Sequence, residues 1–203
     1  QILSALARLS ALRERDALED ALVELVRRDA VPECNSVRLV RAIGEPGAQH
    51  WQVRAGFAQE LDTTERDRVW ADWSGLPVVA DYPLRQQAIA IGNVVQHGND
   101  PCLAIFPLER DPMQACVLEV ESAQPLHNGQ CHTVHWLLAI YRNLIGLLDY
   151  GEKDALTGLL NRHGLEGSFA LDLERAQRFS RPLSVLMFDI DHFKHINDSQ
   201  GHL

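Results

Sequence analysis

Two aspartates near the carboxyl end, Asp189 and Asp191, have a spacing that could serve a metal ion. They follow the apolar residues 183–188, and in an extended chain alternate side chains point to opposite faces, so one carboxylate alone would face a given ion. Mg²⁺ prefers oxygen ligands and takes several of them from water and substrate phosphates. Lys194 and the amides of the intervening turn would attract such phosphates. The pattern predicts a nucleoside triphosphate site, although Asp-x-Asp by itself also occurs on ordinary surfaces.

The elements before these aspartates must hold them in place. The pattern predicts a helix over 164–179, a break at Arg181-Pro182 and a buried strand over 183–188 that ends at the carboxylates. A helix followed by a strand with acids at its carboxyl end is half of an α/β catalytic unit. The other half is not contained in the 203 residues.

Two motifs in this region together resemble the opening of the GGDEF domain of diguanylate cyclases. The first is Asp154-Ala-Leu-Thr-Gly-Leu-Leu-Asn-Arg162, and the second is Phe188-Asp-Ile-Asp-His-Phe-Lys-His-Ile-Asn-Asp198, followed by Gly201-His202. The resemblance implies a palm-like α/β domain from a bacterial signalling protein. In that family two domains each bring one GTP, and Mg²⁺ assists their condensation into cyclic di-GMP, which implies a homodimer.

The resemblance also assigns roles to individual positions. It implies that Asp189 and the backbone carbonyl of Ile190 bind Mg²⁺, that His192, Phe193 and Lys194 line the GTP phosphates, and that Asn197 hydrogen-bonds the guanine edge. His192 stands where the family commonly has Phe. The GG[DE]EF loop, which supplies a second metal carboxylate, does not occur before Leu203, so we expect the chain as it stands to be catalytically incomplete.

The first part of the chain predicts an antiparallel sheet flanked by helices. Apolar residues at three- and four-residue steps predict a long amphipathic helix over 2–28. Alternating patterns and turn residues predict about five strands. The expected elements are a hairpin of 36–43 with 50–55, a short helix over 63–73, and strands over 88–95, 102–108 and 115–120.

This layout is similar to a GAF sensory domain, with a PAS-type sensor as the rival interpretation. We therefore expect an α+β chain with a GAF-like domain at 1–150, whose terminal helix covers about 130–153, and the start of a GGDEF domain at 154–203. Residues 1–150 contain no Lys, so the Asn-Lys signature of cyclic-nucleotide-binding GAF domains is absent. The ligand of this domain, an unknown small-molecule signal, is not specified. Trp70 and Trp73 could cover a ligand pocket, although packing on the sheet is the simpler interpretation.

The long helix offers a surface for a second helix. A 3-4-3 spacing predicts a dimer seam formed by Leu137, Ile140, Leu144 and Leu147, and the alternative is that this stripe packs only on its own sheet. Cys131, His132 and His135 at the start of the same helix could approach a metal or haem. A helix surface or dimer contact is the stronger interpretation, because no fourth ligand is near in the sequence.

Composition narrows the function further. The formal charge of -9 argues against a surface for nucleic acid or anionic lipid. Four widely spaced cysteines predict a reducing, cytoplasmic compartment, and no apolar run is long enough for a membrane segment. We expect the sensory part of a diguanylate cyclase under GAF control. The alternative is a non-catalytic signalling module, with a degenerate GGDEF domain or a sensor that only binds a ligand or a partner.

Overall fold

The computed structural model describes residues 9–45, 47–59, 63–67, 75–109, 115–178, 180–192 and 198. The chain divides into two compact units, Gln1–Asp149 and Tyr150–Leu203. Each unit is described by itself below.

The amino-terminal unit is built on a six-stranded antiparallel sheet with the order β3-β2-β1-β6-β5-β4. The long strands β1 and β2 form the predicted hairpin, in which Ile43 pairs with His50. The strands are β1 Cys34–Ile43, β2 His50–Ala58, β3 Thr63–Glu65, β4 Val95–His97, β5 Cys102–Glu109 and β6 Cys116–Ser122. The α+β class and the antiparallel sheet are confirmed, with two edge strands of only three residues each.

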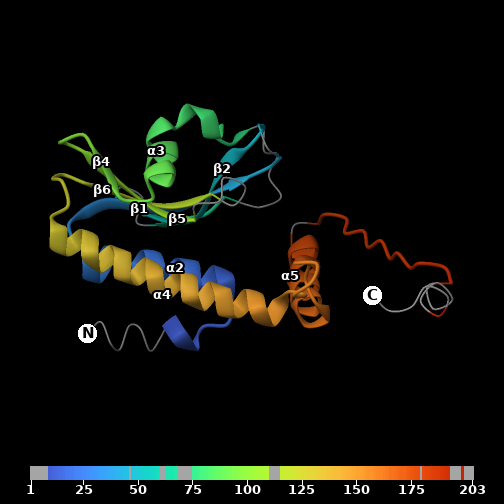
Figure 1. The fold of residues 1–203 in the computed structure, drawn as a ribbon. Helices are drawn as coiled ribbons and strands as arrows, with labels where there is room; N and C mark the ends of the chain where they lie inside the picture. Colours follow the sequence, from blue (N-terminus) through green and yellow to red (C-terminus); the bar gives the residue numbers. More distant parts are fainter. Residues whose placement is uncertain are drawn as a thin grey trace. The chain divides into compact units, whose positions relative to one another are not determined.

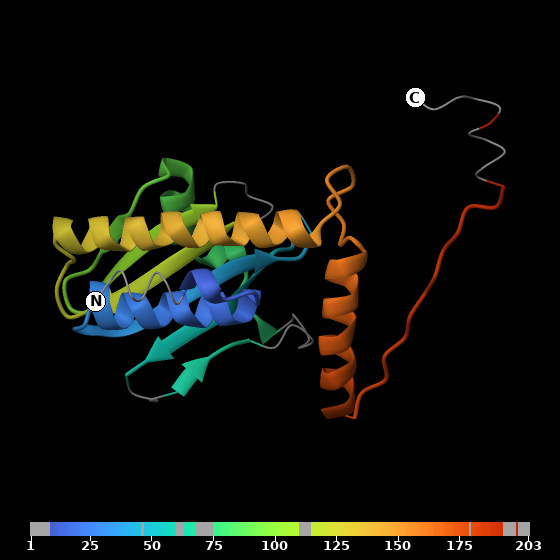
Figure 2. The ribbon, with the colours of Figure 1, turned by 90° about the horizontal axis from the view of Figure 1, so that it is seen from below.

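Helices cover both faces of this sheet. On one face α2, Arg15–Leu25, lies beside α4, Asn128–Glu152, and on the other face lies α3, Pro83–Ile91 (Figures 1 and 2). At its carboxyl end α2 widens into a π-helical turn, Val26–Ala30. Among the helices of the described residues, none combines the length and apolar character needed to cross a membrane.

The strands contribute side chains to two separate apolar cores, because successive side chains alternate between the two faces of the sheet. Val37 and Leu39 of β1 join the larger core beneath α2 and α4, whereas Val40 joins the smaller core beneath α3. In β6, Leu118 and Val117 divide in the same way. An apolar pattern on both faces therefore requires a helical cover on both sides, as observed.

Three sequence predictions in this unit are wrong in part. The first half of the strand predicted over 88–95 is helix α3, which begins at Pro83 and ends before Gly92, and only Val95 lies in a strand, β4. Proline suits the first helical position, and Gly92 adopts the left-handed conformation (φ 68°) that closes a helix. The predicted helix over 63–73 begins instead with β3, and Trp70 and Trp73 lie outside the described residues. The predicted helix over 2–28 is interrupted at 12–14.

A buried cluster of charges fastens α2 to the sheet. Glu19 is fully buried, and its carboxylate accepts hydrogen bonds from Arg54 Nε at 3.2 Å and Arg66 Nη1 at 3.2 Å. Arg66 also binds Asp20 at 2.7 Å. A buried carboxylate is tolerated only when it is paired in this way. On the same helix Arg15 forms an ion pair with Asp149 near the end of α4.

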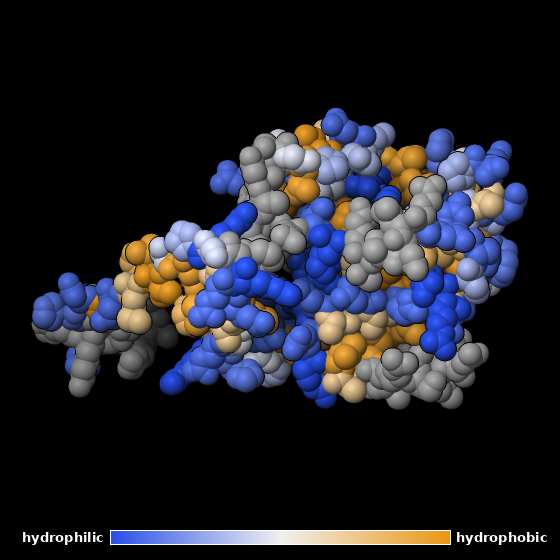
Figure 3. Space-filling view, turned by 180° about the vertical axis from the view of Figure 1, so that it is seen from behind, coloured by the Kyte–Doolittle hydropathy of each residue, from blue (hydrophilic) through white to orange (hydrophobic). Residues whose placement is uncertain are grey.

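The carboxyl-terminal unit contains the last turn of α4, a tight loop, and α5, Arg162–Arg178. Residues 181–190 follow without regular secondary structure. The predicted buried strand over 183–188 is therefore wrong for this structure, and Val185 and Phe188 are exposed. Apolar residues lie open on this unit in Figure 3. The physical reason is that a strand needs a neighbour for its backbone, and none of the described residues pairs with this segment.

Candidate functional site

The first motif forms a loop that is held by its own side chains. One oxygen of Asp154 accepts hydrogen bonds from Thr157 N at 2.9 Å and Thr157 Oγ1 at 2.7 Å. These bonds, first that of the hydroxyl and then that of the amide, lower the pKa of Asp154. Gly158 closes the turn with a positive φ of 70°, which favours glycine. The motif residues here build structure rather than a reactive site.

Asn161 joins this loop to both neighbouring helices. Its Nδ2 donates to the carbonyl of Gly151 at 2.9 Å, and its Oδ1 accepts from the amide of Gly164 at 2.9 Å. The second bond is an N-terminal cap of α5. A Cβ at Gly164 would lie 2.4 Å from the carbonyl oxygen of Glu152, so only glycine fits there. The motif thus sets the path from α4 into α5.

The residues predicted to bind metal and nucleotide are exposed where the structure describes them. Asp189, Asp191 and His192 are exposed, and Ile190 is 62% exposed. His192 has a positive φ of 56°, a conformation in which His is enriched among residues other than glycine. Phe193, Lys194 and Asn197 lie outside the described residues.

The oxygen atoms that Asp189 and Ile190 offer are of the type that Mg²⁺ binds. A carboxylate and a backbone carbonyl are the hard oxygen ligands that this ion takes. The described residues hold no group of three or more His, Cys, Asp or Glu side chains that could enclose a metal ion. The assignment of Asp189 to a metal ion stays a prediction from the sequence.

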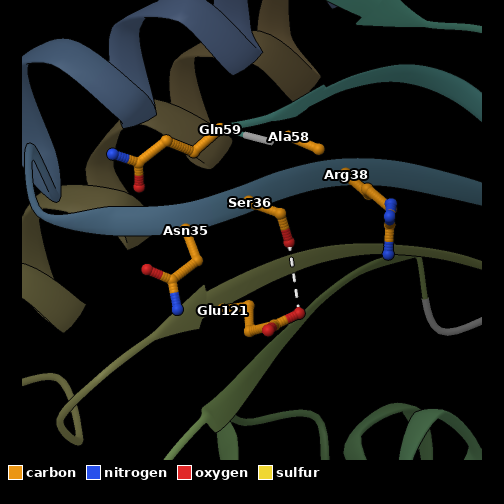
Figure 4. A pocket seen from close by; sticks show the side chains of 6 residues that line it. All are labelled: Asn35, Ser36, Arg38, Ala58, Gln59 and Glu121. Carbon is orange, nitrogen blue, oxygen red and sulfur yellow. Dashed lines mark hydrogen bonds between the residues drawn. The ribbon is translucent and has the colours of Figure 1, made fainter. Parts of the chain in front are cut away.

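A pocket of about 390 Å³ opens on the α3 side of the sheet, at the end of β2 and the start of β1 (Figure 4). Its lining is polar except for one alanine, and it consists of Asn35, Ser36, Arg38, Ala58, Gln59 and Glu121. Ser36 Oγ lies 3.4 Å from a carboxylate oxygen of Glu121, its partner across the β1–β6 pair.

Beside this pocket lies a buried ion pair between α3 and the sheet. Arg85 Nε and Nη2 donate to the two carboxylate oxygens of Glu119 at 2.6 and 2.8 Å. The guanidinium also lies over the rings of Tyr82 at 4.0 Å and Trp51 at 5.1 Å. Both charged side chains are nearly buried. This pair fixes α3 on its sheet face.

Comparison with known proteins finds a family similar to the part of the chain that contains the carboxyl-terminal motifs. Residues 152–203 match the family model described as the diguanylate cyclase GGDEF domain. The diguanylate cyclase DosC of Escherichia coli (strain K12) is 41% identical over 73 residues, which are 35% of this chain and 16% of that protein.

Two further relatives match over 52 and 49 residues. An uncharacterized signaling protein of Caulobacter vibrioides is 46% identical over 52 residues, 26% of this chain and 6% of its own. The cyclic di-GMP phosphodiesterase NbdA of Pseudomonas aeruginosa is 47% identical over 49 residues, 24% of this chain and 6% of its own. The chain thus spans at most 16% of these three relatives.

The amino-terminal part has the fold of a GAF domain. The crystal structure of a GAF domain/HD domain protein from Geobacter sulfurreducens matches with a TM-score of 0.51 at 9% identity, over 69% of this chain and 97% of that one. Identity this low shows the fold alone. The predicted combination of a GAF-like fold with a GGDEF segment is confirmed.

The four leucine and isoleucine residues of the predicted seam do not lie on one exposed face of the GAF-fold unit. Leu137 is 4% exposed within the core, and Leu144 is half-buried against the same core. Ile140 is half-buried and Leu147 is 69% exposed. Leu137 and Leu144 therefore pack on their own unit, which was the alternative interpretation of the stripe.

The Cys131, His132 and His135 group does not converge on one point. Cys131 is buried next to Gln96, His132 is exposed, and the Nδ1 of His135 lies 2.9 Å from the carbonyl of Cys131. The ring of His135 meets Phe106 edge to face. These contacts are structural.

Sequence reasoning missed the polar residues of the GAF-fold unit. The buried Arg85–Glu119 pair and the pocket at Ser36 and Glu121 were not foreseen. One signal was available, because β6 carries two acids on one face of an otherwise apolar strand. A charge that interrupts an apolar strand requires a partner, but its partner on α3 could not be located while 88–95 was taken for a strand.

Proposed function

We propose that the chain is the sensory and regulatory portion of a diguanylate cyclase that condenses two GTP molecules into cyclic di-GMP under control of the GAF-fold domain. The observation that carries the proposal is the match of residues 152–203 to the GGDEF domain, with both motifs present. The similarity to DosC supports the same activity. The proposed reaction also needs a second metal carboxylate, and the 203 residues contain no GG[DE]EF sequence that would supply it.

In this proposal each nucleotide contact has a named residue. Asp189 and the carbonyl of Ile190 hold Mg²⁺, which supplies charge neutralisation at the reacting phosphate. His192, Phe193 and Lys194 line the triphosphate, where Lys194 offers its positive charge. Asn197 recognises the guanine edge, since a carboxamide can both donate and accept hydrogen bonds.

A homodimer through α4 is part of the proposal, with a seam revised by the structure. The face turned away from the core carries residues at 4-3-4-3 steps: Trp136, Ile140, Asn143, Leu147 and Tyr150. Trp136 is 72% and Tyr150 85% exposed. This spacing is that of a coiled-coil seam, and a polar Asn143 within it would fix the register of two helices. Ile140 and Leu147 remain from the predicted seam.

The cyclase proposal is tested on the full-length encoded protein. Purified protein is incubated with GTP and Mg²⁺, and cyclic di-GMP is measured by chromatography. We expect product from the wild type, no product from Asp189→Asn, and unchanged product from Glu174→Gln, an exposed control on α5. Failure of the wild type to bind GTP or to form product would overturn the proposal.

A second candidate function is a nucleotide-binding regulator without turnover. The observation that favours it is the similarity to NbdA, which is named for the opposite activity on cyclic di-GMP. The GGDEF region alone therefore does not identify the reaction of a protein. In the same experiment, binding of GTP without formation of cyclic di-GMP would support this candidate.

A further inference from the structure

Two side-chain donors in the smaller core, beneath α3, have no hydrogen-bond acceptor. The indole N–H of Trp51 and the Nη1 of Arg85 are buried, and none of the described residues accepts a hydrogen bond from either group. Trp51 is 1% exposed, and the side chain of Arg85 is 9% exposed. Buried donors are almost always paired, because an unpaired donor has given up its hydrogen bond to water. The two groups therefore indicate an acceptor that comes from outside the chain.

The two donors are neighbours, and both are held in place. Arg85 Cζ lies 5.1 Å from the centre of the Trp51 ring. Glu119 accepts hydrogen bonds from Nε and Nη2 of Arg85, at 2.6 and 2.8 Å, so the planar guanidinium directs Nη1 away from that carboxylate. The backbone N–H of Trp51 donates to the carbonyl of Pro77 at 2.8 Å. Both donors are thus presented from adjacent, fixed side chains.

The surroundings favour an acceptor without a charge. The positive charge of Arg85 is already matched by Glu119, and a carboxylate ligand would bring a second negative charge close to Glu119 in a buried site. A carbonyl oxygen is neutral and can accept two hydrogen bonds. The other members of this core are apolar, namely Val40, Ala42, Ala88, Ile105, Ala115 and Val117. The two donors therefore suit a carbonyl group on a small, otherwise apolar molecule.

Tyr82 is the neighbour of these donors that lies nearest to solvent. The centre of its ring is 4.0 Å from Arg85 Cζ, and the residue is 36% exposed. Trp51 and Glu119, on the sheet side of the guanidinium, are buried. A ligand would therefore approach the donors from the side of Tyr82, which directly precedes α3.

We propose that Arg85 Nη1 and Trp51 Nε1 bind the carbonyl oxygen of a small neutral molecule, such as a ketone, ester, lactone or amide, between α3 and β2. The inference goes beyond the proposed cyclase function, because it concerns binding to the GAF-fold domain alone. It gives this domain a chemical class of ligand. Binding can be measured whether or not the protein makes cyclic di-GMP.

The test is a titration of the 203-residue chain with a panel of small ketones, esters, lactones and amides, followed by NMR. The indole N–H of Trp51 belongs to one of four tryptophans, and its signal is assigned by its loss in Trp51→Phe. For each compound that binds, two matched probes replace the carbonyl by a methylene group or by a carboxylate. We expect at least one carbonyl compound to shift the Trp51 signal to saturation, and both matched probes to bind about tenfold or more weakly.

Variants locate the binding, with affinity measured on the signals of the ligand. Trp51→Phe keeps an aromatic ring without the N–H, and Arg85→Lys keeps the charge without Nη1, so each is expected to weaken binding about tenfold or more. Ile91→Ala, an exposed position on the same helix, should leave the affinity unchanged. If one of the two donor variants loses its fold, the other decides.

Two results would overturn the proposal. One is the absence of a saturable shift of the Trp51 signal with every compound of the panel, which would mean that water alone serves the two donors. The other is full affinity in a folded Trp51→Phe or Arg85→Lys variant.

Discussion

In the Arg85–Glu119 pair, each buried charge is compensated by the other. Removing one partner leaves the other charge buried without compensation, which typically costs about 3–5 kcal/mol. We expect Glu119→Leu and Arg85→Met each to lower the free energy of unfolding by an amount of this order. Urea unfolding monitored by circular dichroism measures it.

The double variant is the control for this pair. With both charges replaced by apolar groups of similar size, nothing remains uncompensated, and much of the lost stability should return. Nearly additive losses in the double variant would show instead that packing of Arg85 on Tyr82 and Trp51, rather than charge, accounts for the effect.

Because of Cys116, we expect the free energy of unfolding of the GAF-fold unit to depend on pH in the alkaline range. Burial raises the pKa of this thiol from 9.0 to about 11, against the smaller lowering effect of Arg41. Between these values the unfolded chain loses its proton and the folded chain keeps it. The free energy of unfolding should therefore fall as pH rises from 9 to 11, by at most about 1.4 kcal/mol per pH unit from this group.

Cys116→Ala isolates the contribution. Its unfolding free energy should decline less steeply than that of the wild type above pH 9, although its absolute value is lower because a core side chain is truncated. Chemical denaturation at several pH values between 8.5 and 11.5 measures both slopes, a range set at about the two pKa values. Parallel slopes would contradict the assignment.

At the scale of elements, α4 has two faces with different expected roles. Trp136 and Leu147 are exposed, so Trp136→Ser with Leu147→Ser should abolish the proposed dimer without loss of folding stability. Leu137 is buried, so Leu137→Ala should cost about 2–5 kcal/mol of unfolding free energy. Light scattering and thermal unfolding separate the two effects.

The two variants serve as controls for each other. A double serine variant that remained dimeric would contradict the exposed-face seam. Dissociation caused only by Leu137→Ala would restore the seam predicted from the sequence, and would mean that α4 rotates in the dimer relative to its position in the single chain.

Local patterns predicted the four longer strands and the helices α4 and α5, since hydrophobic periodicity reports which side of an element is buried. The error at 88–95 has a physical cause, because a short apolar run fits a buried strand as well as a helix. Proline at position 83 and glycine at 92 were the available evidence for a helix. The predicted dimer seam stays a prediction, but its residues do not share one exposed face in the single chain. A 3-4-3 stripe identifies an apolar face but does not say which partner covers it, and Leu137 turned out to face its own core.

Of the candidate sites, one could be predicted from the sequence and the other could not. The GGDEF motifs could be recognised from the sequence because their residues are close together in the chain. In the structure, Asp154 bonds to Thr157 within the loop, and Asn161 bonds to Gly151 at the end of α4. The pocket could not be predicted, because Ser36 and Glu121 are separated by 85 positions and meet only when β1 pairs with β6.

At the scale of the whole molecule, a single helix connects the GAF-fold unit to the segment that matches the GGDEF domain. Helix α4 runs without interruption from Asn128 to Glu152, and the Asp154 loop follows directly. Near its end, Asp149 is paired with Arg15 of α2, which is itself attached to the sheet through Glu19. Contacts therefore run continuously from the sheet of the GAF-fold domain to the end of α4. In a dimer, we expect a structural change in this domain to alter the rotation of α4 about its own axis.

This argument predicts different effects of insertions that differ only in length. Two residues inserted after Asp149 rotate everything that follows by about 200°, while seven residues, one heptad, rotate it by only about 20°. In the full-length protein we expect the seven-residue insertion to retain most cyclic di-GMP synthesis and the two-residue insertion to lose it, because two GGDEF domains must face each other to join their nucleotides. Rates are measured with GTP and Mg²⁺, and light scattering verifies that both variants are dimers. Equal rates in two dimeric variants would show that the phase of α4 does not control the reaction, and the connection would then act as a tether.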